Sequence, residues 1–317
     1  MNGPSKELYR KLCAQEKTIP LFLNDWWMDA VCGENWDVAL VLNGSEVVGA
    51  LPYYYTTRLG FKIIKMPKLT GFLGPWIRYP EGQKQVTRLS YEMEILDALI
   101  KALPAFDMFR QRFHYSIHNW LPFYWKKFEQ TTKYTYVLTI ENLDQVFNEF
   151  KSSVRGKIRK ASNLVSVEVD RPLDDFYTLF SMTFERQKIK APSTLAYMAK
   201  FDEALMKRGQ RRIFYAVDGK GGIHSALYLV WDYQSAYVHM VGEDPELRNS
   251  GAGMLLLWEA IQFTRNKLSI STFDFLGSMI ESVETVRRSF GARQVPYFQI
   301  RKANSFAMKM AFFFTET

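Results

Sequence analysis

The residues best suited to chemistry form one glycine-rich stretch. Residues 235–241 before it alternate aromatic and β-branched side chains as a strand does, and residues 254–263 after it have the broad apolar face of a helix. Glycines let a ligand approach the backbone amides, and the first amides of a helix have no internal partner and lie at the positive end of its dipole. The stretch therefore predicts an anion site suited to a diphosphate. It consists of Arg248, Asn249, Ser250, Gly251, Ala252 and Gly253.

Arg248 stands at the start of this loop, where its guanidinium can make a bidentate contact to a phosphate. A plain glycine-rich turn that begins a helix is the alternative interpretation, and three constrained positions do not exclude it. The residues downstream favour the binding site, because they predict a strand at 272–276, a helix at 281–290 and a last strand at 294–300.

Two carboxylates lie where they could act on a substrate. Glu243 ends the strand before the loop and is the candidate general base; a solvated loop carboxylate is the alternative. Asp274 lies in the strand at 272–276, between two phenylalanines. It is either a paired structural carboxylate or a ligand of the substrate, and both alternatives stay open. No Ser/His/Asp or Cys/His arrangement is recognisable, so we expect no covalent intermediate.

A basic segment follows the amphipathic residues 143–150. Arg155, Arg159 and Lys160 are its candidate substrate-binding residues, because a cluster of cations can hold the phosphates of a donor or an acceptor. A solvated basic helix is the alternative.

The bulk composition excludes several classes of protein. The chain has 317 residues, 47% of them hydrophobic and 23% charged, as in an ordinary globular protein. The net charge of +8 favours anionic partners. Two cysteines and four scattered histidines provide no disulfide framework and no metal-ligand spacing. The first residues contain no apolar signal core, and no apolar run is long enough to span a membrane, so we expect a cytoplasmic protein with possible contact to a membrane surface.

The length suggests about two domains. Residues 1–145 contain an expected hairpin around Asn43-Gly44, further strands and a helix at 86–103, which make a mixed α/β unit. Residues 146–317 contain a second set of helices and strands together with the glycine-rich stretch 248–253. We therefore predict an α/β fold, with mixed sheets, in two tandem domains.

The order of these segments resembles the Fem-like branch of the GNAT acyltransferase superfamily, the relatives of the peptidoglycan-bridge aminoacyltransferases. Arg248-x-x-Gly251-x-Gly253 fits the acyl-CoA signature of GNAT enzymes, Arg/Gln-x-x-Gly-x-Gly/Ala. The basic segment, the residues 251–261 with their Leu-Leu-Trp, the strand at 272–276 and the closing segment 286–291 follow in the family's order. The match is best over residues 145–300.

The resemblance implies two GNAT-like domains with a cleft between them, and transfer of an acyl or aminoacyl group to an amine. Two departures are visible. The long coiled-coil insertion of some Fem enzymes is absent, and Val286 and Arg287 stand where GNAT enzymes often have a tyrosine acid.

Three functional hypotheses follow. The first is an N-acyltransferase that uses acyl-CoA as a co-substrate and binds no cofactor permanently. The second is an aminoacyl-tRNA-dependent transferase that acts on a cell-wall precursor. The third is a catalytically silent GNAT-like binding protein. The expected partners are an anionic donor, either acyl-CoA or aminoacyl-tRNA, and an amine acceptor; DNA is not among them.

Overall fold

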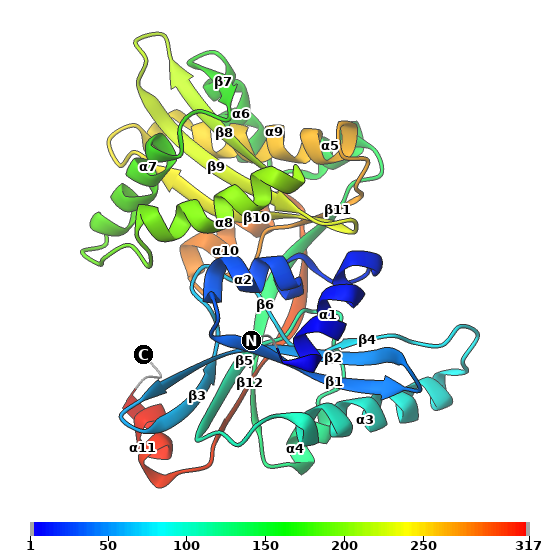
Figure 1. The fold of residues 1–317 in the computed structure, drawn as a ribbon. Helices are drawn as coiled ribbons and strands as arrows, with labels where there is room; N and C mark the ends of the chain where they lie inside the picture. The colour runs from blue at the N-terminus through cyan, green and yellow to red at the C-terminus, as the bar shows by residue number, and fades with distance from the viewer. Residues whose placement is uncertain (1–2, 315–317) are drawn as a thin grey trace. The chain divides into compact units, whose positions relative to one another are not determined.

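The computed structural model describes residues 3–314, with side chains as far as Met310. The chain forms two compact units (Figure 1). Unit 1 comprises Met1–Lys133 and Pro296–Thr317, and unit 2 comprises Tyr134–Val295. None of the described helices is long and apolar enough to cross a bilayer.

Unit 1 is built on an antiparallel hairpin whose turn is the predicted Asn43-Gly44, with Gly44 at a φ of +60°. The sheet order is β1-β2-β3-β5-β12, in which only the pair β3/β5 is parallel. Helices cover both faces of β1, since Trp36 packs on Tyr9 of α1 and Ala39 belongs to the same apolar cluster as Leu96 of α3. The elements are α1 (Pro4–Gln15), η1 (Leu21–Leu23), α2 (Asp25–Cys32), β1 (Trp36–Asn43), β2 (Glu46–Arg58), β3 (Phe61–Lys65), β4 (Trp76–Ile77), α3 (Gln85–Ala102), β5 (Met108–Arg112), α4 (Leu121–Trp125), the start of β6 (Glu129–Thr139), the end of β12 (Arg293–Ala303) and α11 (Phe306–Phe314).

Unit 2 has the sheet order β6-β11-β10-β9-β8-β7, in which only the pair β10/β11 is parallel. Successive residues of β9 point to opposite faces, as in any strand. Leu227 and Leu229 pack in the cluster of α6 and α9, and Tyr228 contacts Phe176 of α7 and Phe201 of α8. The remaining elements are α5 (Leu143–Glu149), α6 (Ser152–Ser162), β7 (Val165–Val169), α7 (Leu173–Glu185), α8 (Leu195–Arg208), β8 (Arg211–Asp218), β9 (Ile223–Trp231), β10 (Ser235–Glu243), η2 (Arg248–Ser250), α9 (Ala252–Asn266), β11 (Thr272–Asp274) and α10 (Glu281–Ser289).

The two units repeat one topology. In unit 1 the antiparallel strands β1-β2-β3 are followed by α3 and by β5, which runs parallel to β3. In unit 2 the antiparallel strands β8-β9-β10 are followed by α9 and by β11, which runs parallel to β10. The expected α/β fold with mixed sheets and two tandem units is therefore confirmed.

The sequence placed the domain boundary at residues 145/146, and the structure places it elsewhere. Unit 2 begins at Tyr134, and residues 296–317 return to unit 1. The cause is an exchange of strands. β6, which follows the elements of unit 1, pairs with β11 in unit 2, and β12, which follows the elements of unit 2, pairs with β5 in unit 1. Local patterns could not show this exchange, because pairing partners far apart in sequence leave no local signal.

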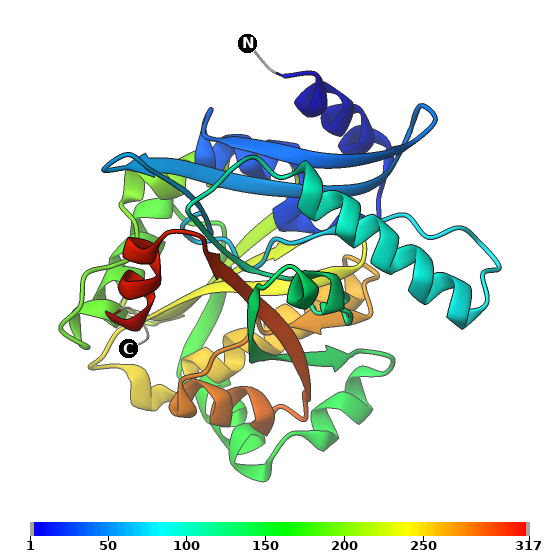
Figure 2. The ribbon, with the colours of Figure 1, turned by 90° about the horizontal axis from the view of Figure 1, so that it is seen from below.

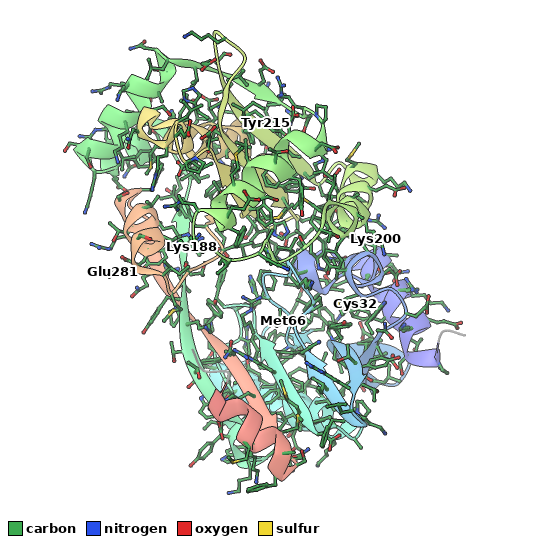
Figure 3. The ribbon with its side chains drawn as sticks, turned by 90° about the vertical axis from the view of Figure 1, so that its left-hand side faces the viewer. Cys32, Met66, Lys188, Lys200, Tyr215 and Glu281 are labelled. Carbon is green, nitrogen blue, oxygen red and sulfur yellow. The ribbon has the colours of Figure 1, made fainter. Side chains whose placement is uncertain are left out.

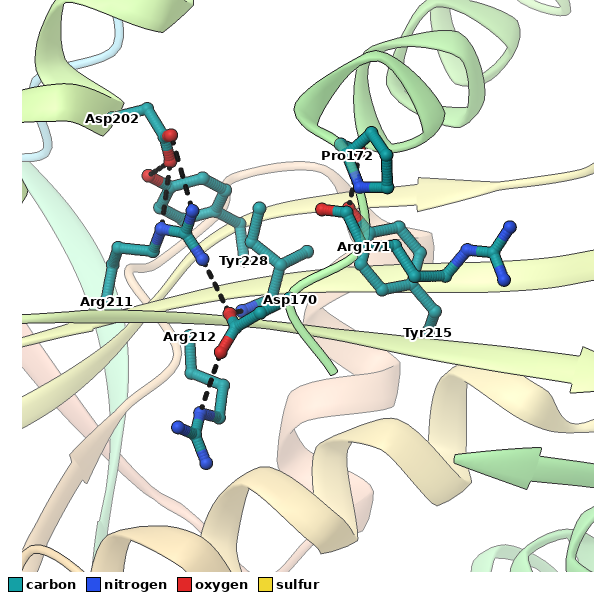
Figure 4. A network of polar contacts seen from close by, with 9 residues as sticks. Asp170, Arg171, Pro172, Asp202, Arg211, Arg212, Tyr215 and Tyr228 are labelled. Carbon is teal, nitrogen blue, oxygen red and sulfur yellow. Dashed lines mark hydrogen bonds and ion pairs between the residues drawn. The ribbon is translucent and has the colours of Figure 1, made fainter. Parts of the chain in front are cut away.

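An ion network that is buried at Asp202 and reaches the surface at Asp170 fixes α8 to the sheet of unit 2 (Figure 4). The Asp202 carboxylate on α8 accepts a hydrogen bond from the Tyr228 hydroxyl and lies 3.0 Å from Nε of Arg211. Arg211 also pairs with Asp170, which lies 3.4 Å from Nε of Arg212. A buried carboxylate needs such partners to offset its desolvation, so the network holds α8 in one position.

Candidate functional site

The predicted strand, loop and helix are present in unit 2. β10 ends at Glu243, the short 3-10 helix η2 covers Arg248–Ser250, and α9 begins at Ala252. The Ala252 amide donates to the Ser250 hydroxyl at 3.3 Å. Within the described residues, the amides of Gly251 and Gly253 have no hydrogen-bond acceptor. The start of α9 therefore presents donors and a positive dipole end to an anion.

The structure requires glycine at one of the two glycine positions of this loop but not at the other. Gly251 has a φ of +82°, and a Cβ there would lie 2.9 Å from the carbonyl oxygen of Lys157 on α6. Glycine is thus required at Gly251 for the close packing of α6, whatever else the position does. A Cβ on Gly253 would lie 3.7 Å from Oε1 of Glu243, which is an ordinary contact.

The Glu243 carboxylate lies beside the start of α9. Its Oε2 atom is 3.6 Å from Nε of Arg248, and its backbone amide donates to the Thr183 hydroxyl on α7 at 3.1 Å. Burial raises the pKa of Glu243, and the cations Arg248, Arg186 and Lys157 oppose that rise. The structure thus brings together two residues to which the sequence gave separate roles, the candidate base and the candidate phosphate ligand.

Cations from three elements converge on this position. Arg248 comes from η2, Lys157 from α6 and Arg186 from the end of α7. Lys160 of α6 donates to the carbonyl of Asn249 in the loop at 3.3 Å. Lys157 belongs to the predicted basic segment but was not among its candidate substrate-binding residues, although residues three apart on a helix, such as Lys157 and Lys160, share a face. Arg186 was not predicted, because no local signal points to it.

The other two predicted basic residues lie away from the loop contacts. Arg155 donates through Nη1 to the carbonyls of Asn148 and Phe150, where it closes the turn between α5 and α6. Arg159 is exposed on α6. Of the three expected substrate-binding residues, only Lys160 contacts the loop.

The strands β10 and β11 separate close to this loop. They pair from Ser235/Thr272 to Tyr237/Asp274 and no further, although β10 continues to Glu243. β10 has an irregularity between Val238 and Met240, and its other edge stays paired with β9 to the end. Within unit 2, no strand therefore pairs with the edge of β10 from Val238 to Gly242, and the next amide, that of Glu243, is held by Thr183.

Asp274 holds the point where β11 turns away. Its Oδ1 atom accepts hydrogen bonds from the Thr135 hydroxyl and from the Leu276 amide, the latter at 2.8 Å. The Gly277 amide donates to the same Thr135 hydroxyl at 2.9 Å. Asp274 is 1% exposed, and burial raises its pKa to about 6. Its charged neighbours are Arg287 and Asp232. It shares none of these partners with Glu243, so the two expected catalytic carboxylates stand in separate environments.

The thiols do not offer an alternative nucleophile. Burial raises the pKa of the Cys13 thiol to about 12 and raises that of Cys32, labelled in Figure 3, further still. Both therefore stay protonated at neutral pH, where a thiolate would be needed. Among residues 3–314, no group of His, Cys, Asp and Glu side chains could hold a metal ion.

The segment that contains the loop matches a known family. Residues 148–281 match the family described as an acetyltransferase (GNAT) domain. This segment lies within unit 2 and contains β10, the loop and α9. No curated protein matches the chain at a significant level.

Several solved structures share the fold over nearly the whole chain. FemX is 14% identical with a TM-score of 0.69, and the match covers 94% of this chain and 96% of that chain. L-PGS from Bacillus licheniformis is 9% identical with a TM-score of 0.56, and the match covers 98% and 95%. A tandem GNAT protein from the clavulanic acid biosynthesis pathway is 12% identical with a TM-score of 0.53, and the match covers 95% and 94%. At these identities the likeness establishes the fold alone.

Proposed function

We propose that this chain, whose residues 148–281 form a GNAT acetyltransferase domain within a Fem-type fold, transfers an acyl group from an acyl-CoA to an amine by direct attack. One observation carries the proposal. The loop 248–253 presents unpaired amides at the start of α9. Its own Arg248 and the neighbouring Lys157 and Lys160 lie close to the half-buried carboxylate of Glu243.

The donor diphosphate would lie at the start of α9. The amides of Gly251 and Gly253 would donate to it, and the segment Asn249, Ser250 and Ala252 would shape the turn around it. Arg248 would exchange its partner, the Glu243 carboxylate, for a phosphate oxygen.

This exchange has a chemical consequence for Glu243. Without its nearest cation, the carboxylate is stabilised less, so its pKa rises beyond the increase that burial already causes. A carboxylate with a raised pKa is a stronger base for the ammonium proton of the acceptor. Donor binding would thus activate the base at the position where the acyl group arrives.

The reaction would proceed by addition of the amine to the thioester and elimination of CoA. The neutral amine attacks the thioester carbonyl, the C–N bond forms, and the carbonyl oxygen becomes an oxyanion. Backbone amides on the open edge of β10, beyond the irregularity at Val238, are the available donors for it. The oxyanion then collapses to the amide carbonyl as the C–S bond breaks, and the proton lost by the attacking nitrogen is taken up by the CoA thiolate as CoA leaves. Asp274 would act by fixing the point where β11 turns away.

A second candidate donor is an aminoacyl-tRNA. The order of segments that resembles the peptidoglycan-bridge aminoacyltransferases is the ground for it, and the fold match to FemX is consistent with that order. Several cations around one helix start would suit the phosphates of tRNA as well as those of CoA.

Calorimetry with the full chain distinguishes the donors. We expect CoA and acetyl-CoA to bind, and Arg248→Ala to weaken both by about 10–150-fold, the loss of one charged hydrogen bond of about 1.5–3 kcal/mol. Arg265→Ala is the matched control, since Arg265 is exposed at the opposite end of α9. Absence of CoA binding at millimolar ligand would end this proposal. Binding of an aminoacyl-tRNA analogue in its place would establish the second candidate.

A further inference from the structure

The short helix α4 in unit 1 displays large apolar side chains on its outer side. Leu121, Tyr124 and Trp125 are 45%, 57% and 57% exposed. We call these three residues the α4 patch. The inner side of the same helix is buried, because Pro122 and Phe123 face the core. Single exposed apolar residues are ordinary, whereas three on five consecutive positions form a patch that calls for an explanation.

The exposure of the α4 patch is fixed by the packing beneath it. The Phe123 ring lies 5.1 Å from Phe113 and 5.2 Å from Phe128, edge to face in both pairs. The Asn119 side chain accepts from the Leu121 amide at 3.1 Å and so closes the start of the helix. The patch is therefore held outward by a rigid support.

Lysines surround the patch and outnumber the acids. Lys101 and Lys126 both pair with Asp97 of α3, at 2.6 and 3.2 Å. Lys127 follows Lys126 and is exposed, and Lys302 of β12 donates to the carbonyl of Lys126 at 2.8 Å. The nearby Glu129 is paired with Arg301. Four lysines and Arg301 thus stand against two acids, Asp97 and Glu129, which leaves these residues with a positive net charge.

This combination matches the chemistry of a bilayer surface. Tyr and Trp have an apolar body and a polar tip, which suits the level of the lipid headgroups. Lysines at the rim of such a patch reach anionic headgroups while their stems lie along apolar surface. We propose that the α4 patch docks unit 1 on a membrane that contains anionic phospholipid.

A second apolar contribution lies on the same side of unit 1. Figure 1 shows α11 and α4 at the lower end of this unit, and Figure 2, seen from below, shows both in front of its strands. Phe306 at the start of α11 is exposed, and so is Met310. No described helix spans a bilayer, so the contact is with the surface.

Sedimentation of the full chain with lipid vesicles tests this proposal. The probes are vesicles of phosphatidylcholine alone and vesicles with about one third phosphatidylglycerol. We expect binding to the anionic vesicles that weakens as salt rises. The variant Tyr124→Ser/Trp125→Ser should lose at least tenfold in affinity. Lys126→Gln/Lys127→Gln should lose about fivefold for each lysine at low salt.

Matched controls stand elsewhere on the surface. Tyr233→Ser removes a similarly exposed aromatic residue from unit 2, and Lys207→Gln removes an exposed lysine, so both should bind vesicles as the parent does. All variants should keep a melting temperature close to that of the parent, because the altered side chains lie at the surface and their ion pairs there contribute little to stability. Equal binding by parent and patch variants would overturn the proposal. So would concentration-dependent dimerisation that the aromatic variant abolishes while vesicles stay unbound, since the patch would then be an interface between two copies.

Discussion

Replacing the buried Asp274 by Asn should change how the stability of unit 2 depends on pH. The Asn side-chain oxygen can still accept from Thr135 and Leu276, but it carries no charge at any pH. Burial raises the pKa of Asp274 from 3.8 to about 6 in the folded protein. The proton is therefore held more tightly in the folded state. The stability that this group contributes is present at pH values below 3.8 and is lost as the pH rises to about 6.

The magnitude follows from the two pKa values. A shift of about two units means that Asp274 lowers the free energy of unfolding by about 3 kcal/mol at pH 7.5 and by about 1 kcal/mol at pH 4.5. From pH 4.5 to pH 7.5, the free energy of unfolding of Asp274→Asn should therefore rise by about 2 kcal/mol relative to that of the parent. For a unit of this size that corresponds to about 4–8 °C in melting temperature.

Scanning calorimetry at a series of pH values from 4.5 to 7.5 measures this difference. Asp218→Asn is a control that should keep a constant gap to the parent over this range. His224 and the amides of Gly222 and Lys220 hold the pKa of Asp218 below its usual value of 3.8, so its stabilisation is lost only at pH values below the range. A constant gap between parent and Asp274→Asn across this range would refute the reasoning, because it would mean that Asp274 does not titrate there.

Two further predictions concern the loop. Gly251→Ala should lower the melting temperature at a cost of about 1–3 kcal/mol, because the new Cβ would lie 2.9 Å from the Lys157 carbonyl oxygen in a left-handed backbone. Gly253→Ala is the control and should melt as the parent does. Equal melting temperatures of the two variants would contradict the packing argument. Arg248→Ala should shift the acidic limb of the kcat/KM profile to higher pH, because Glu243 loses a cation that lowers its pKa. An unmoved limb would remove Glu243 from the role of base.

The local parts of the site could be predicted from sequence. The segment from β10 to α9 was recognisable because glycine conformation, helix periodicity and a strand pattern are properties of adjacent residues. The turn at Asn43-Gly44, where Gly44 has the left-handed conformation, was recognisable for the same reason. The convergence of Arg186 with Arg248 on Glu243 was not, because α7 reaches β10 only through tertiary packing. Gly251 carried the family signature, yet its contact with α6 needed coordinates.

The exchange of β6 and β12 bears on how the chain is made. β5 is synthesised about 190 residues before the end of its neighbour β12, so the two strands cannot pair fully for about 10–40 s at ordinary rates of synthesis. During that interval the edge of β5 that β12 will cover is unpaired, and an open strand edge is a template for association with other chains. β6 emerges early and waits for β11 in the same way. A nascent chain that stops after unit 2 would therefore lack a structural strand of unit 1, and loss of residues 296–317 would act as a folding defect in the part that was synthesised first.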